Sequence, residues 1–187
     1  MRLGIAHHLG WAIAVTASTD HRVIDRRRIE PGLPAAPIHH AGGPHLLHRS
    51  GAPLDDDGLA TLLVEVRASV VRTASTAIDE LGTVLTEPMI MIALRAWPTD
   101  FPVDIAVQRR VPYEIRADSV MYCKILGDLA RQRDWAVHTY DGKTVEDDAA
   151  RILGSRANEV LRGPRRTLGP PWSKDHRMAL AATVVAA

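Results

Sequence analysis

The sequence predicts an α/β fold, in which a mixed five-stranded sheet is flanked by helices. Two observations lead to this prediction. Three short strand-like segments near the N-terminus are separated by tight turn signals, which is typical of an antiparallel meander. Later apolar segments then alternate between helix and strand, which favours strands added in parallel. The 187 residues are 46% hydrophobic and 24% charged, so we expect residues 1–187 to form a single domain.

The strand predictions rest on short apolar runs bounded by turns. In chain order, the predicted strands cover Arg2–His7, Trp11–Ser18, Arg22–Glu30, Met89–Leu94 and Trp135–Tyr140. The fourth run is continuously apolar, as expected for a central strand that is covered on both faces. Arg26, Arg27 and Arg28 fall on alternating faces of the third strand, which indicates an edge strand protected by charge.

The helix predictions rest on apolar spacing and capping residues. Asp55, Asp56 and Asp57 open a long helix that Gly82 is expected to end. Its apolar face comprises Leu59, Leu62, Leu63, Val66, Val70, Ala74, Ala77, Ile78 and Leu81. Three further helices are predicted. Asp118 would cap a helix over Ser119–Gln132, and a Thr144/Asp147 capping box would begin a helix that ends at Gly154. Ser173 would cap the last helix, Lys174–Val185. The last is apolar on nearly all sides, so we expect it in the interior.

Residues 31–54 have a different composition. They contain five prolines, several glycines and four histidines, and neither the strand nor the helix period runs through them. A loop insertion of this length inside a domain is typically a lid, a binding loop or a flexible insertion.

Charge and cysteine content limit the function classes. The net charge of +1 excludes a protein that coats a polyanion through bulk charge, but it leaves room for a local basic groove. The single cysteine, Cys123, lies in the apolar run Val120–Ile125 and is interpreted as core filler in a reducing, cytoplasmic compartment. No stretch approaches the roughly 18 apolar residues of a membrane span. Leu9–Ala17 lacks a basic leader, so we expect neither secretion nor a membrane partner.

Two stretches carry a family resemblance. Residues 3–10, Leu-Gly-Ile-Ala-His-His-Leu-Gly, and residues 175–182, Asp-His-Arg-Met-Ala-Leu-Ala-Ala, resemble the opening strand and the closing helix of the ribonuclease H-like superfamily, most closely its Holliday-junction resolvase branch. The resemblance implies phosphodiester cleavage by two divalent metals held by carboxylates, and homodimers are common in that branch. Asp175 matches an acidic position directly, whereas the other two positions fall on Ala6 and near Ala93–Arg95, where no acid stands.

The same resemblance implies that the ends of the first and fourth strands meet the start of the last helix. His7, His8, Arg95, Asp175 and His176 would then form one site. Adjacent strand residues point to opposite faces, so at most one of the two strand histidines faces the site. We expect it to be His7, as metal ligand or base, with Asp175 as the second metal ligand. His176 would donate a proton and Arg95 would clamp phosphate.

Each of these roles has a simpler alternative. Asp175 would be favoured in a first helical turn by the helix dipole alone. His176 could face solvent, and Arg95 could pair with a core acid. If the site does hold a metal, imidazoles with one carboxylate favour manganese or zinc over magnesium.

Further residues are candidates for substrate binding. They are His8, His39, His40, Arg116, Arg165 and Arg177. Arg116 and its neighbours Arg109 and Arg110 could contact phosphates, although Arg116 could instead pair with Asp118.

Together these patterns indicate a nucleic-acid-binding or nucleic-acid-processing protein of resolvase-like fold. If it is an enzyme, we expect a metal-dependent phosphodiesterase with a histidine-modified site. An inactive interaction protein on the same fold is an equally weighted alternative. A small-molecule phosphoesterase with a histidine-held metal and a lid at residues 31–54 is a third. The sequence contains no GxSxG, P-loop, GxGxxG or HExxH motif.

Overall fold

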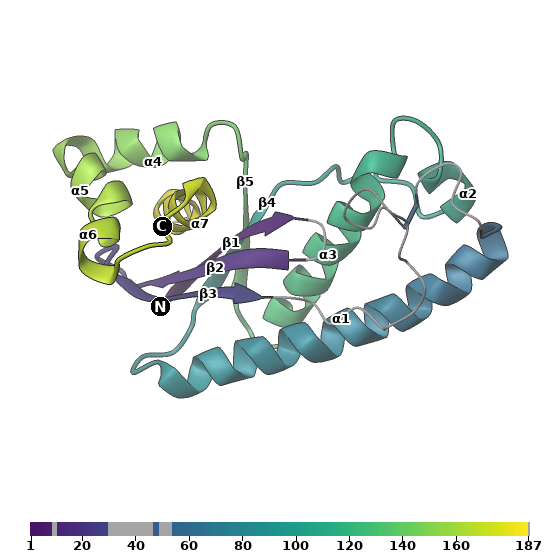
Figure 1. Cartoon of the computed structure of the whole chain (residues 1–187), viewed down its shortest axis with the longest axis horizontal. Helices are drawn as coiled ribbons and strands as arrows, with labels where there is room; N and C mark the ends of the chain where they lie inside the picture. The colour runs from purple at the N-terminus through teal and green to yellow at the C-terminus, as the bar shows by residue number, and fades with distance from the viewer. Residues whose placement is uncertain (9–10, 30–46, 49–53, 187) are drawn as a thin grey trace.

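The structure is a computed structural model that describes residues 1–8, 11–29, 47–48 and 54–186. The described residues form a five-stranded sheet in the order β3-β2-β1-β4-β5 (Figure 1). Its strands are β1 (Arg2–His8), β2 (Trp11–Ala17), β3 (Val23–Ile29), β4 (Met91–Arg95) and β5 (Ala136–Tyr140). β2 is antiparallel to both β1 and β3, while β4 is parallel to both β1 and β5. The predicted mixed sheet, with a meander followed by parallel strands, is confirmed.

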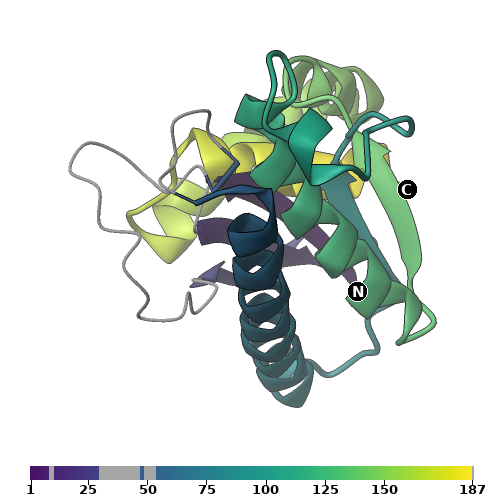
Figure 2. The same cartoon turned by 90° about the vertical axis from the view of Figure 1, so that its right-hand side faces the viewer.

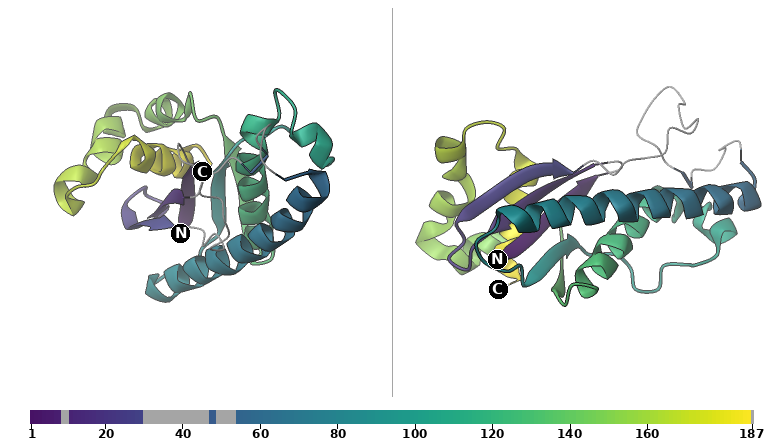
Figure 3. Two further views of the ribbon diagram at one scale, coloured as in Figure 1. Left: turned by 45° about the vertical axis from the view of Figure 1, so that its right-hand side comes forward. Right: turned by 90° about the horizontal axis from the view of Figure 1, so that it is seen from below.

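Helices cover both faces of the sheet, as Figures 2 and 3 show. The long helix α1 (Asp56–Val84) and α3 (Glu114–Arg131) pack on one face, while α4 (Val145–Leu153) and α7 (Lys174–Val185) lie on the other. The remaining short helices are α2 (Ile105–Gln108), the 3-10 turn η1 (Gly154–Arg156), α5 (Ala157–Arg162) and α6 (Pro164–Leu168). No helix in the described part of the chain is long and apolar enough to cross a membrane.

The predicted boundaries of α1 and α3 are partly wrong. Asp55 caps α1 and accepts a hydrogen bond from the Gly58 amide, as its acidic start suggested, but the helix passes through Gly82 and ends at Val84. A glycine in a helix interior costs only about 1 kcal/mol, so packing of the apolar face carries the helix past it. α3 begins at Glu114 instead of Ser119. Asp118 therefore lies inside the helix and is not its cap.

Capping differs between the two helices on the opposite face. Thr144 stands at the N-cap position of α4, but its side chain makes no capping hydrogen bond, so the predicted capping box with Asp147 is wrong. Its hydroxyl instead donates to Asp148 at 2.7 Å. α7 covers the predicted residues, Lys174–Val185, after Ser173. Residues 178–184 are buried, which confirms its place in the interior.

α7 runs antiparallel along β1 at unusually close range. Arg2 donates to the Thr183 carbonyl near one end of the pair, and an ideal Cβ on Gly4 would lie 1.9 Å from the Ala179 carbonyl oxygen. Only a residue without a side chain fits between strand and helix there. Because the helix is seated this deeply, its first turn lies over the carboxyl end of β1.

This contact predicts opposite outcomes for two glycine substitutions. Gly4→Ala should destabilise the protein by about 1–3 kcal/mol or more, because the added methyl group displaces α7. Gly82→Ala is the matched control, since its Cβ would meet nothing within 4 Å, and it should stabilise α1 by up to about 1 kcal/mol. Urea unfolding of the two variants measures both effects. Equal stability of Gly4→Ala and the unsubstituted chain would contradict the close contact.

Candidate functional site

The two adjacent histidines of β1 lie on opposite faces of the sheet, as strand geometry predicts. His8, on the α7 face, places Nε2 3.0 Å from Asp175 Oδ1. The side chains of this pair are 39% and 22% exposed. The prediction that His7 joins Asp175 is therefore wrong, because alternation along β1 turns His7 toward α3. The histidine that meets the matching acid of the resemblance is His8.

Trp11 holds the His8 ring from the neighbouring strand. The two residues are paired across the β1–β2 hairpin, and their rings stack at 4.2 Å with an interplanar angle of 16°. The Arg28 guanidinium lies 4.5 Å from the centre of the Trp11 ring, a cation–π distance. One stacking contact and one hydrogen bond thus fix the orientation of the His8 imidazole.

A groove of about 400 Å³ adjoins this pair, between the β2–β3 edge of the sheet and the start of α7. Its lining residues are Trp11, Ile13, Arg26, Arg27, Arg28, Pro171, Ser173, Asp175 and His176. β3 is an edge strand, as predicted, and residues 26–28 contribute to the groove lining. The Arg26 and Arg28 side chains lie on the α7 face, whereas Arg27 alternates to the α1 face. His8 contacts two lining residues, Trp11 and Asp175, so the His8–Asp175 pair borders the groove.

The arginines of β3 differ in their partners. Arg26 donates to the carbonyl oxygens of residues 168–171, and these acceptors are neutral, so its positive charge is not cancelled by them. Arg27 binds both carboxylate oxygens of Asp25, at 2.8 and 3.1 Å. That hydrogen bond raises the pKa of Arg27. Arg26 therefore fastens the segment before α7 to β3 and leaves a net cation at the groove.

His176 is buried and caps the start of α7, so the alternative that it faces solvent is wrong. Its Nδ1 accepts a hydrogen bond from the Ser173 amide at 3.2 Å and lies 2.8 Å from the Ser173 hydroxyl. The ring packs against Trp172, and burial is the main cause that lowers its pKa. His176 lines the groove while it stabilises the first turn of α7. Its predicted role as a proton donor stays a prediction.

His7 belongs to the core between β1 and α3. Its Nε2 lies 2.6 Å from the Ser119 hydroxyl and 3.4 Å from the Cys123 sulfur, and its residue exposure is 4%. Burial, aided by the positive charge of Arg95, lowers the pKa of His7 to about 4. Cys123 is buried as predicted, and burial raises the pKa of its thiol to about 12. Both groups are therefore neutral at pH 7.

Arg95 lies at the end of β4, behind the first turn of α7. Its Nη2 is 3.6 Å from the Met178 sulfur, its Nε is buried without a hydrogen-bond partner, and Gly142 leaves room for the guanidinium. Arg95 does not line the groove described above. The prediction that Arg95 clamps phosphate therefore does not fit this groove. No acid of the described residues pairs with Arg95 either, so the alternative of a core ion pair is also wrong.

Asp118 anchors a distant part of the chain. Its carboxylate accepts from the Leu47 amide at 2.7 Å and lies 2.7 Å from His48 Nδ1, with both side chains 1% exposed. Asp118 therefore does not pair with Arg116, which is exposed. Removing one partner of such a buried pair is strongly destabilising, which points to a structural role for this contact.

The other predicted substrate ligands are dispersed. Arg165 is exposed on α6, next to the segment that Arg26 binds. Arg177 donates to Glu146 at 3.0 Å and thereby joins α7 to α4, so its guanidinium is used within the protein. His39 and His40 lie outside the described residues.

The side chains gathered here do not fit the two-metal centre that the resemblance implies. Among the described residues, no three His, Cys, Asp or Glu side chains come close enough to hold one ion. Asp175 is the single carboxylate at the expected position, and β4 supplies Arg95, a cation, where an acid is needed. A guanidinium repels a divalent cation and cannot ligate it. The predicted His7–Asp175 pair of manganese or zinc ligands is not formed.

Trp11 and Arg28 are the site residues that the sequence reasoning missed. The signal for Trp11 was present in the sequence, because His8 and Trp11 flank the turn signal Leu9-Gly10, which predicts cross-strand neighbours in a hairpin. Arg28 could be placed on an edge strand, but its position over Trp11 depends on the twist of β3 and on the register with β2.

The buried state of His7 predicts a pH dependence of stability. The pKa of His7 is lower in the folded protein than in the unfolded chain. The stability of the folded state that depends on a neutral His7 is therefore fully present above about pH 6.5 and is lost as the pH falls toward 4. Between pH 7 and pH 5 the loss should amount to about 2 kcal/mol. Urea unfolding at both pH values should show this loss in the unsubstituted chain and in a His138→Gln control, whose position is exposed, but not in His7→Gln. An unchanged pH slope in His7→Gln would contradict the assignment.

Comparison of the chain with models of protein families, with curated proteins and with solved structures finds no match. The arrangement of His8, Trp11, Arg28 and Asp175 around the groove is therefore the basis for any functional proposal.

Proposed function

We propose that this chain is a nucleic-acid-binding protein of ribonuclease H-like, resolvase-like arrangement, which holds a phosphate backbone along the groove between β3 and the start of α7. The observation that carries the proposal is the groove itself, whose walls include Arg26 and Arg28 on the α7 face of β3. Arginine supplies directional donors for phosphate. The Trp11 ring supports this wall of the groove, since it stacks on His8 and lies under the Arg28 guanidinium.

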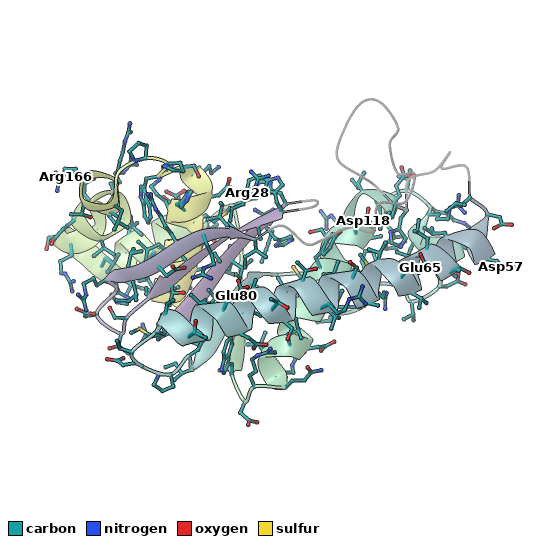
Figure 4. The ribbon with its side chains drawn as sticks, turned by 60° about the horizontal axis from the view of Figure 1, so that its bottom comes forward. Arg28, Asp57, Glu65, Glu80, Asp118 and Arg166 are labelled. Carbon is teal, nitrogen blue, oxygen red and sulfur yellow. The ribbon has the colours of Figure 1, made fainter. Side chains whose placement is uncertain are left out.

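The uneven charge of the molecule supports this choice of face. Residues 55–87, which include α1, carry seven acidic and two basic side chains, whereas residues 154–177 carry six basic and two acidic ones. Figure 4 shows Asp57 and Glu65 toward one end of the molecule, Arg166 at the opposite end, and Arg28 near the end of β3. Glu80 lies further along α1, beneath the strands. A polyanion would be attracted to the half that holds the groove and repelled from the tip of α1.

The order of the elements supports the ribonuclease H-like part of the proposal. A three-strand meander is followed by two parallel strands that join β1 on its free side, and the last helix lies along β1. Asp175, the acid that matches the resemblance, stands at the carboxyl end of β1 as that arrangement requires. Ala6 and Arg95 stand where the resemblance would place acidic residues. Their presence favours nucleic-acid binding, or chemistry without a metal pair, over the metal-dependent cleavage of the family.

Salt-dependent binding tests the proposal. Labelled single-stranded RNA and duplex DNA, titrated between about 50 and 200 mM KCl, should bind with an affinity that falls steeply with salt. The double variant Arg165→Glu/Arg166→Glu, on α6 beside the groove, should weaken binding and reduce the log–log salt slope by about 2.

The matched control reverses the same number of charges elsewhere. Arg67 and Arg72 are exposed on α1, and Arg67→Glu/Arg72→Glu should leave affinity and slope nearly unchanged. The proposal would be overturned if the protein bound neither RNA nor DNA. It would also be overturned if both double variants lost the same amount of affinity.

A further inference from the structure

We infer that His8 and Asp175 form a metal-independent catalytic pair that cleaves single-stranded RNA held in the groove; this inference rests on the proposed function. The first step of the argument is the hydrogen bond itself. An ionised carboxylate only accepts hydrogen bonds, so the 3.0 Å contact places the proton of a neutral His8 on Nε2. The lone pair then resides on Nδ1, where it can accept a proton from a substrate.

The second step concerns the orientation of the imidazole. A surface histidine normally samples several rotamers, whereas His8 is held by Asp175 on one ring atom and by the stacked Trp11 ring on its face. The side chain is nevertheless 39% exposed, so a substrate can reach it. A general base has to be fixed in this way and still be accessible, since geometry precedes basicity in proton transfer.

The third step selects the substrate class. Hydrolysis of DNA requires an activated external water as the nucleophile, which the carboxylate-poor site cannot supply through a metal pair. RNA carries its own nucleophile, the 2′-hydroxyl, next to the phosphorus, and this proximity replaces much of the work of a metal. One oriented imidazole beside cationic groove walls is sufficient chemistry for this reaction.

The reaction is an internal transesterification. His8 Nδ1 takes the proton of the 2′-hydroxyl while the O2′–P bond forms and the P–O5′ bond breaks. The leaving O5′ keeps the electron pair of the broken bond and takes a proton from solvent water. Asp175, as a positioning residue, stabilises the imidazolium until it returns its proton to solvent. The products are a 2′,3′-cyclic phosphate end and a 5′-hydroxyl end, and no water is consumed.

The test uses a labelled single-stranded RNA and its 2′-O-methyl counterpart, both in excess EDTA. The RNA should be cut to 2′,3′-cyclic ends, whereas the 2′-O-methyl strand should bind and remain intact. His8→Ala should lower the cleavage rate constant by at least about 100-fold. His138→Ala, at an exposed position on β5, is the matched control and should cleave normally.

Two further variants separate chemistry from folding. Asp175→Asn should slow cleavage by up to about 100-fold, with unchanged affinity for the 2′-O-methyl strand. Added imidazole should restore part of the activity of His8→Gly, which only a folded site can show. Intact RNA that is nevertheless bound, cleavage that EDTA abolishes, or His8→Ala as active as His138→Ala would overturn this inference and leave the binding proposal standing. Failure to bind either strand would instead overturn the proposed function.

Discussion

The close contact between α7 and β1 is the constraint on which the site depends. Gly4 lets the helix backbone approach the strand to a distance that no side chain permits, and the two elements run antiparallel from that point. Four residues before Ala179 along the helix and four residues after Gly4 along the strand, Asp175 meets His8. A deeply seated helix therefore converts two separate stretches of sequence into one pair of interacting side chains. The Ser173–His176 cap and the Arg26 contacts hold the start of the same helix in place.

The two histidines of β1 point to opposite faces of the sheet and therefore lie in different environments. His7 is enclosed with Ser119 and Cys123, and burial keeps it neutral. His8 remains half-exposed beside a carboxylate and against an aromatic ring. Arg95 occupies the strand end where the resemblance would place an acid, and its charge acts against a divalent metal nearby. The same sequence changes that remove a metal pair thus leave an oriented imidazole next to an arginine-lined groove.

Much of the fold could be predicted because its signals are local. Apolar spacing located α1, and Ser173 located the start of α7. The sequence also showed that His7 and His8 face opposite ways, but not which one faces α7, since that depends on the side of the sheet where the last helix packs. The start of α3 at Glu114 was missed because its N-cap residue, Tyr113, makes no side-chain capping hydrogen bond. Asp118, which was interpreted as the cap, instead binds Leu47 and His48, far away in sequence. The groove was missed because β2, β3 and the start of α7, which are far apart in sequence, come together only in three dimensions.

The tautomeric state of His8 tests the central claim most directly. In the unsubstituted protein, nitrogen-15 NMR of the neutral form of the imidazole should show one tautomer, with its proton on Nε2, because Asp175 accepts that proton. Asp175→Ala should release the ring into a mixture of tautomers. A proton on Nδ1 in the unsubstituted protein, or the same mixture with and without Asp175, would contradict the account.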